Sequence, residues 1–92
     1  MTGNDVPFLP RGVRLHYDKV RGTNVLLGPE RALILDDISN IILAQLDGER
    51  SVDAICKNLA ETYAAPLDQI ATDTLALLTD LANKRLLEAR CD

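Results

Sequence analysis

The spacing of apolar residues changes once along this chain, at Asp36, and that change constrains the fold more than any other feature. Before Asp36, apolar residues alternate or run in short stretches separated by glycine and proline, which is typical of β-strands. After it, they recur every three or four residues, as on one face of an α-helix. Because the strands and helices occupy separate halves of the sequence, we predict a fold of the α+β class.

The first half predicts three short strands. The turn residues Arg21-Gly22 and the breaker Gly28-Pro29 separate them, so the strands are joined by tight turns in an antiparallel meander. The last strand is apolar on both faces. The predicted strands are residues 13–17, 24–27 and 31–35.

The second half predicts three helices. Asp36 or Asp37 caps the first helix and Gly48 ends it, while Ser51 caps the second and Pro66 stops it. The third starts near Leu67-Asp68. The residues expected to face inward are Ile38, Ile41, Ile42 and Leu46 in the first helix; Val52, Ile55, Leu59, Ala60 and Tyr63 in the second; and Ile70, Ala71, Leu75, Leu77, Leu78, Leu81 and Ala82 in the third, with Leu86 and Leu87 at its end.

With 92 residues, the chain is expected to build one core. We predict a flexible lead-in over residues 1–10 and a single domain over residues 11–90, with the element order βββααα of a winged helix-turn-helix-like fold. No stretch of eighteen apolar residues and no secretory signal are present, and the two cysteines show no paired spacing. These features favour a cytoplasmic protein.

Catalytic chemistry has few candidate residues here. His16 alternates with apolar neighbours and is expected on the solvated face of a strand, while Ser39 and Ser51 stand where helices begin. Cys56 falls among apolar residues at helical spacing and is expected to be a small buried side chain. Two cysteines and one histidine do not make a metal site. We therefore expect no enzyme activity, no metal and no cofactor.

A winged helix-turn-helix outline ordinarily predicts DNA binding through the third helix. Ten basic residues against fourteen acidic ones give a net charge of −4, and the early exposed positions of that helix include Asp68 and Asp73. Both carboxylates repel phosphate. The basic residues that do cluster lie on the first strand and its turn; they are Arg11, Arg14, Lys19 and Arg21. A DNA-binding regulator therefore remains the alternative function, and no nucleic acid is expected as the main partner.

The third strand offers a different kind of site. In a meander, residues 31–35 form an edge, and four apolar residues follow Arg31 without the charges that usually protect an edge. Such an edge accepts an extended peptide by strand addition, or pairs with a second copy of the chain. The apolar stripe of the third helix is wide enough to serve as a second wall. The residues alone leave peptide binding and self-association equally open.

A series of short motifs from Pro7 to Glu88 carries a family resemblance. The motifs are Pro10-Arg11-Gly12-Val13-Arg14-Leu15, Arg21-Gly22, Val25-Leu26-Leu27, Pro29-Glu30-Arg31, Leu35-Asp36, Ile42-Leu43, Asp47-Gly48, Ser51-Val52, Ile55, Leu59-Ala60, Tyr63, Ile70 and Leu86-Leu87. In this order and spacing the chain resembles the pyrroloquinoline quinone (PQQ) biosynthesis protein D family. Arg85 is a departure, since glycine is expected before the final Leu-Leu.

The resemblance implies a peptide chaperone, that is, a recognition element for ribosomally made and post-translationally modified peptides (RiPPs). It implies two partners: the PQQ precursor peptide and the radical S-adenosylmethionine (SAM) iron–sulfur enzyme that modifies it. It also implies that the peptide adds as a strand beside the third strand, in a groove walled by the third helix, and strand exchange at the same edge would give a homodimer. Carried onto this chain, the peptide-binding residues are Arg31, Ala32, Leu33, Ile34 and Leu35 on the strand, and Ile70, Asp73, Thr74 and Leu77 on the helix.

Overall fold

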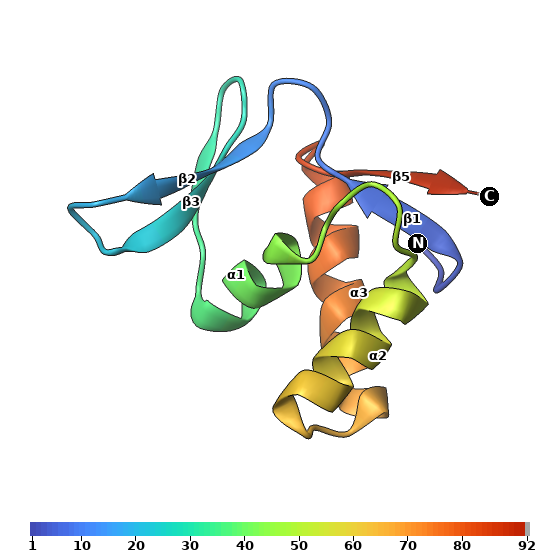
Figure 1. The fold of residues 1–92 in the computed structure, drawn as a ribbon. Helices are drawn as coiled ribbons and strands as arrows, with labels where there is room; N and C mark the ends of the chain where they lie inside the picture. The colour runs from blue at the N-terminus through green and yellow to red at the C-terminus, as the bar shows by residue number, and fades with distance from the viewer. Residues whose placement is uncertain (92) are drawn as a thin grey trace.

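The computed structural model describes residues 1–91, which form two small antiparallel sheets and three helices (Figure 1). This arrangement confirms the α+β class. The helices segregate to the second half of the chain, as the change of period at Asp36 predicts. The elements are β1 (Asp5–Phe8), β2 (Arg14–Asp18), β3 (Thr23–Leu27), β4 (Ala32–Ile34), α1 (Asp37–Ala44), α2 (Val52–Tyr63), α3 (Leu67–Asn83) and β5 (Glu88–Cys91).

The predicted meander is present as the three-stranded sheet β2-β3-β4, with β3 in the centre. Leu26 pairs with Leu15 on one side and Leu33 on the other, and these three leucines face the core. The next register position places His16, Val25 and Ile34 on the opposite face of the sheet. The edge position predicted for the third strand is confirmed.

The predicted flexible lead-in is wrong for residues 5–8, which form β1. This strand pairs with β5 in the register Val6 to Arg90, and Val6 is 2% exposed. Two prolines in ten residues suggested an unstructured segment, but Pro7 lies within the strand and is itself buried. The order βββααα therefore lacks a strand at each end, and the second sheet joins the two ends of the chain (Figure 1).

The helix starts follow the predicted capping residues, whereas α1 ends at Ala44 with Gln45 as its C-cap, before the predicted end at Gly48. Asp36 caps α1, because its Oδ1 accepts a hydrogen bond from Ser39 N at 2.7 Å, and Ser51 caps α2 by accepting one from Ala54 N at 3.2 Å. Pro66 stands at the start of α3 as expected. The end of α3 differs from the prediction. Arg85 adopts a left-handed conformation with φ of 61°, so the helix stops at Asn83 and the Leu86-Leu87 pair lies beyond it.

The core contains most of the predicted inward positions, among them Ile42, Ile55 and Leu78. Two predicted core residues are instead exposed: Ile38 is 61% exposed and Tyr63 is 54% exposed. Each stands at the end of its helix, where the apolar stripe extends past the neighbouring element that covers the rest. Within residues 1–91, no helix has the length and apolar character needed to cross a membrane.

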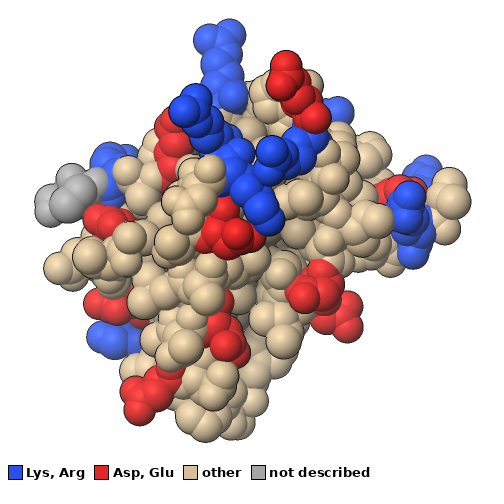
Figure 2. All heavy atoms as spheres, turned by 180° about the vertical axis from the view of Figure 1, so that it is seen from behind, with Lys and Arg blue, Asp and Glu red and all other residues tan. Residues whose placement is uncertain are grey.

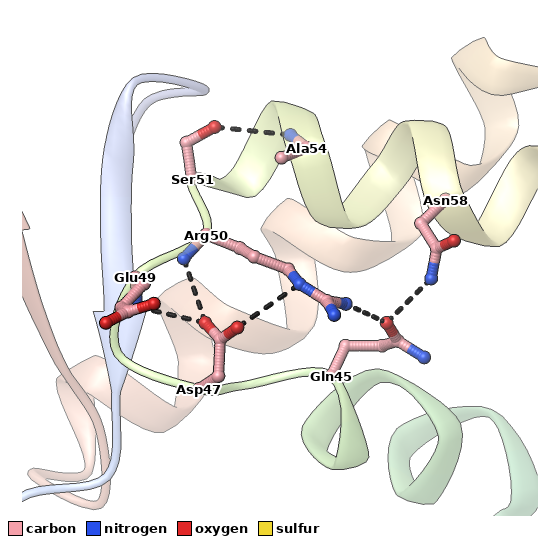
Figure 3. A network of polar contacts seen from close by, with 7 residues as sticks. All are labelled: Gln45, Asp47, Glu49, Arg50, Ser51, Ala54 and Asn58. Atoms are coloured by element: carbon pink, nitrogen blue, oxygen red, sulfur yellow. Dashed lines mark hydrogen bonds and ion pairs between the residues drawn. The ribbon is translucent and has the colours of Figure 1, made fainter.

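A polar network holds the turn between α1 and α2 (Figure 3). Asp47 Oδ1 accepts hydrogen bonds from Glu49 N and Arg50 N, both at 2.9 Å, and the Arg50 guanidinium forms an ion pair with the Asp47 carboxylate. Gln45 Oε1 accepts from both Arg50 Nη1 and Asn58 Nδ2 at 2.8 Å. Because Asn58 belongs to α2, these bonds fix the end of α1 against α2.

Candidate functional site

The outer edge of β4 is open. Among the described residues, β4 pairs only with β3, so the backbone groups on its other side have no strand partner. Ile34 is 59% exposed on this strand and Ala32 is also exposed. An exposed edge that carries apolar side chains and lacks protective charge within the strand is able to pair with an added strand.

A pocket of about 220 Å³ lies among the three helices, and one of these helices, α1, closely follows the edge strand in the sequence. The chain passes from Ile34 into α1 through only two residues, and Ile38 on the first turn of α1 reaches the pocket. In Figure 1, α1 lies between the three-stranded sheet and the α2–α3 pair. The lining residues are Ile38, Ile41, Ile42, Leu59, Tyr63, Ile70, Asp73 and Thr74.

The pocket is apolar apart from Tyr63 and two residues of α3. Asp73 supplies the one carboxylate of the lining, and Gln69 Nε2 donates to it at 3.1 Å. Thr74 is fully buried and is also part of the lining. A hollow of this composition accommodates an apolar side chain, or the aliphatic part of a longer side chain whose polar end meets Asp73.

Three predicted peptide-binding residues of α3 meet in this pocket, namely Ile70, Asp73 and Thr74. The fourth, Leu77, is half-buried against the core outside the lining. On the strand side, Leu33 and Leu35 turn their side chains toward the core, and Leu35 is only 6% exposed. The strand segment therefore exposes Arg31, Ala32 and Ile34.

The contribution of α1 and α2 to this pocket does not follow from the sequence pattern alone. Ile38, Ile41 and Tyr63 were predicted as core residues, but they line the pocket. One sequence feature does point to them. The three isoleucines Ile38, Ile41 and Ile42 occupy one face of a helix that begins soon after an apolar edge strand.

The other candidates for chemistry lie outside the pocket. His16 is exposed on β2, as predicted. Cys56 is 2% exposed, and burial raises the pKa of its thiol, with the Thr74 hydroxyl offsetting part of the rise. The two groups approach without hydrogen-bond geometry, and the Thr74 hydroxyl has no hydrogen-bond partner among residues 1–91. A buried, protonated thiol is a poor nucleophile.

An open strand edge that leads into an apolar pocket is the arrangement of domains that bind extended peptides by strand addition. Residues 23–87 match the family model described as coenzyme PQQ synthesis protein D, PqqD. The chain belongs to the PqqD family.

Relatives and solved structures match nearly the whole chain. A "PqqA binding protein" of Rhizobium meliloti is 48% identical over 88 residues, which cover 96% of this chain and 90% of the relative. The solution structure of the PqqD part of Methylobacterium extorquens PqqCD, described as a functional and stand-alone RiPP recognition element, superposes with a TM-score of 0.83 at 48% identity, covering 95% and 93% of the two chains. The crystal structure of PqqD from Xanthomonas campestris gives a TM-score of 0.61 at 40% identity, covering 96% and 98%.

Proposed function

We propose that this chain is the recognition element that binds the PqqA precursor peptide in PQQ biosynthesis. The peptide adds as a strand to β4, and one of its side chains enters the pocket between α1 and α3. The observation that carries this proposal is the unpaired outer edge of β4, which carries the exposed Ile34, followed closely in the chain by a pocket at which Ile38 and Tyr63 are also exposed. Large exposed apolar side chains that cluster around a hollow mark interaction sites.

Strand addition supplies affinity through the backbone. The free edge of β4 offers amide and carbonyl groups to any extended chain, so this pairing fixes the position of the peptide without reading its sequence. Sequence preference then comes from the pocket. Asp73 at its margin favours a side chain with a donor or a positive charge at its tip, whose aliphatic part packs on Ile38 and Ile70.

In this proposal the chain carries out no chemistry itself. It holds the peptide and delivers it to the radical SAM enzyme of the pathway, which raises the effective concentration of the peptide at that enzyme. A fused relative, the bifunctional PQQ synthesis protein C/D of Methylorubrum extorquens, carries such a domain within a longer protein. Because the precursor is made on ribosomes, we place this step in the cytoplasm.

The proposed relation to winged helix-turn-helix domains is supported by the three-stranded meander and the short α2–α3 connection. In this proposal the ligand pairs with the sheet edge and meets α3 at the pocket, whereas a DNA-binding domain would place the third helix in the major groove. The same open edge also allows two copies to exchange strands, so the peptide and a second copy compete for it.

Isothermal titration calorimetry with the PqqA peptide of the same genome tests the function. Ile38→Lys places a charge in the pocket, and we expect it to weaken binding at least about tenfold, since it removes an apolar contact. The folded state is retained, because Ile38 is already 61% exposed. Val20→Lys is the matched control, as Val20 is 96% exposed between β2 and β3. Equal affinities of both variants and the wild type would overturn the pocket assignment.

A further inference from the structure

A second hollow lies at the Arg31 end of β4, away from the apolar pocket. The turn between β3 and β4 forms one wall and the segment after α3 forms the other. Its lining residues are Pro29, Glu30, Arg31, Lys84, Arg85 and Leu86. We refer to it as the basic cleft.

The two walls of the basic cleft are held in place by local packing. Gly28 N donates to Arg31 O at 2.7 Å, which closes the turn and fixes Arg31. A Cβ atom at position 28 would approach Leu86 Cδ2 to 2.6 Å, so glycine allows the turn to lie directly against the buried Leu86. On the other wall, Leu86 N donates to Leu81 O at 2.9 Å and closes the end of α3. The arginines beside these contacts therefore project from a fixed backbone.

Positive charge is left unpaired in the basic cleft, although the whole chain is acidic. Lys84 Nζ is neutralised by the Asp80 carboxylate at 2.8 Å. Arg31 and Arg85 are exposed and form no ion pair within the part of the chain that the structure describes, and Glu30 is the one carboxylate in the lining. Figure 2 shows several Lys and Arg side chains, with Asp and Glu side chains among them, at the end of the molecule where the β3–β4 turn lies in Figure 1.

We propose that the basic cleft binds a carboxylate side chain of the peptide that pairs with β4. This inference rests on the proposed function, and it adds the chemical class of residue that the peptide must carry. Arg31 directly precedes β4, so a strand added to that edge has one of its two ends beside the cleft. Neighbouring strands lie only about 4.8 Å apart, which brings a peptide side chain near Ala32 within reach of an arginine.

The two ends of β4 then bind different side chains of the peptide. The Ile34 end leads to the apolar pocket and the Arg31 end to the basic cleft, with two residues of strand between them. A matching peptide carries an apolar or amphipathic residue at one end of a short extended stretch and an aspartate or glutamate at the other. Because the two ends differ, the charge also fixes the direction in which the peptide lies along β4.

Calorimetry of the full chain with the PqqA peptide tests this cleft. Removing one guanidinium, as Arg31→Gln or Arg85→Gln, is expected to weaken binding about threefold, and the double variant about tenfold, as for exposed ion pairs. Arg85→Lys keeps the charge and is expected to restore most of the affinity. The matched control is the double variant Lys19→Gln/Lys57→Gln, which changes net charge equally at exposed positions outside the lining.

Peptides in which each aspartate or glutamate is replaced in turn by its amide identify the partner residue. With one of these peptides, the double variant Arg31→Gln/Arg85→Gln is expected to bind no more weakly than the wild type. The change in the peptide and the change in the protein then remove the same interaction. Two results would overturn the cleft as a binding site and leave the proposed function intact. One is that the double variant binds the peptide as tightly as the wild type; the other is that the lysine control loses as much affinity as the double variant. A wild-type chain that binds no peptide would overturn both.

Discussion

At the scale of single residues, Arg85 occupies a conformation that favours glycine. Its φ of 61° is unfavourable for a residue with a Cβ atom, whereas glycine adopts this conformation without the same cost in free energy. We expect Arg85→Gly to stabilise the fold by about 0.5–1 kcal/mol, after the greater freedom of glycine in the unfolded chain is subtracted. Urea denaturation measures the gain.

Ala64→Gly is the matched control for Arg85→Gly, since Ala64 ends α2 with φ of 50° and lies outside the basic cleft. Both variants are expected to gain stability, but only Arg85→Gly loses affinity for the peptide. Retained affinity in that variant would show that the arginine side chain plays no part in binding.

Thr74 supports a second prediction at this scale. Its hydroxyl is buried without a hydrogen-bond partner among the described residues, which costs about 1–3 kcal/mol. The isosteric change Thr74→Val is therefore expected to raise the free energy of unfolding by about 1 kcal/mol. Thr72→Val on the same helix is the control, because the exposed Thr72 hydroxyl already donates to Asp68 O. A loss of stability in Thr74→Val would contradict the account of this residue.

At the scale of elements, Asp36 stabilises the start of α1 and Asp47 stabilises the turn that follows it. The bond from Ser39 lowers the pKa of Asp36, and bonds from the Arg50 and Glu49 amides lower the pKa of Asp47. A lowered pKa in the folded state means that the stabilisation is present above the ordinary value of 3.8 and is lost as the pH falls through the folded value. Since α1 lines the pocket, acid is expected to weaken both the fold and peptide binding.

Thermal unfolding followed from neutral to acidic pH tests this role of α1. On acidification, the melting temperature of the double variant Asp36→Asn/Asp47→Asn is expected to fall less than that of the wild type, because the variant lacks the two carboxylates whose protonation destabilises the fold. Asp37→Asn, in the first turn of the same helix, is the control. An identical pH dependence in all three proteins would contradict the assignment.

The elements most firmly predicted from the sequence are those with local causes. Asp36, Ser51 and Pro66 define where helices begin because capping and proline geometry act within a few residues. The open edge of β4 follows from a meander, which is also local. By contrast, β1 exists only because β5 pairs with it from the other end of the chain, and no local pattern in residues 5–8 indicates that partner.

The residues of the site could be predicted from the sequence only in part, for the same reason. Periodicity predicts which face of α1 is apolar, but not that Ile38 at its start stays exposed. It gives no sign that the last turn of α2 brings Tyr63 to the same pocket. Which apolar residues stay exposed depends on how the helices pack, and that is a property of the assembled fold.

At the scale of the whole molecule, the second sheet joins both ends of the chain to α2. Val6 and Pro7 are buried in β1, and Gly3 O accepts a hydrogen bond from Asp53 N at 3.0 Å. Removing residues 1–8 is therefore expected to lower the free energy of unfolding by about 3 kcal/mol, mainly from lost apolar burial. Urea denaturation of the shortened chain gives this value, and an unchanged midpoint would contradict a structural role for β1.

The central claim, that a peptide adds to β4 and enters the pocket beside α1 and α3, is tested most directly by nuclear magnetic resonance. The ¹⁵N-labelled chain is titrated with the PqqA peptide and the amide signals are followed residue by residue. We expect the signals of residues 31–34, 38–42 and 70–74 to move, and the amides on the free edge of β4 to become protected from exchange. Shifts confined to β2 and its basic residues, with β4 unchanged, would contradict the account.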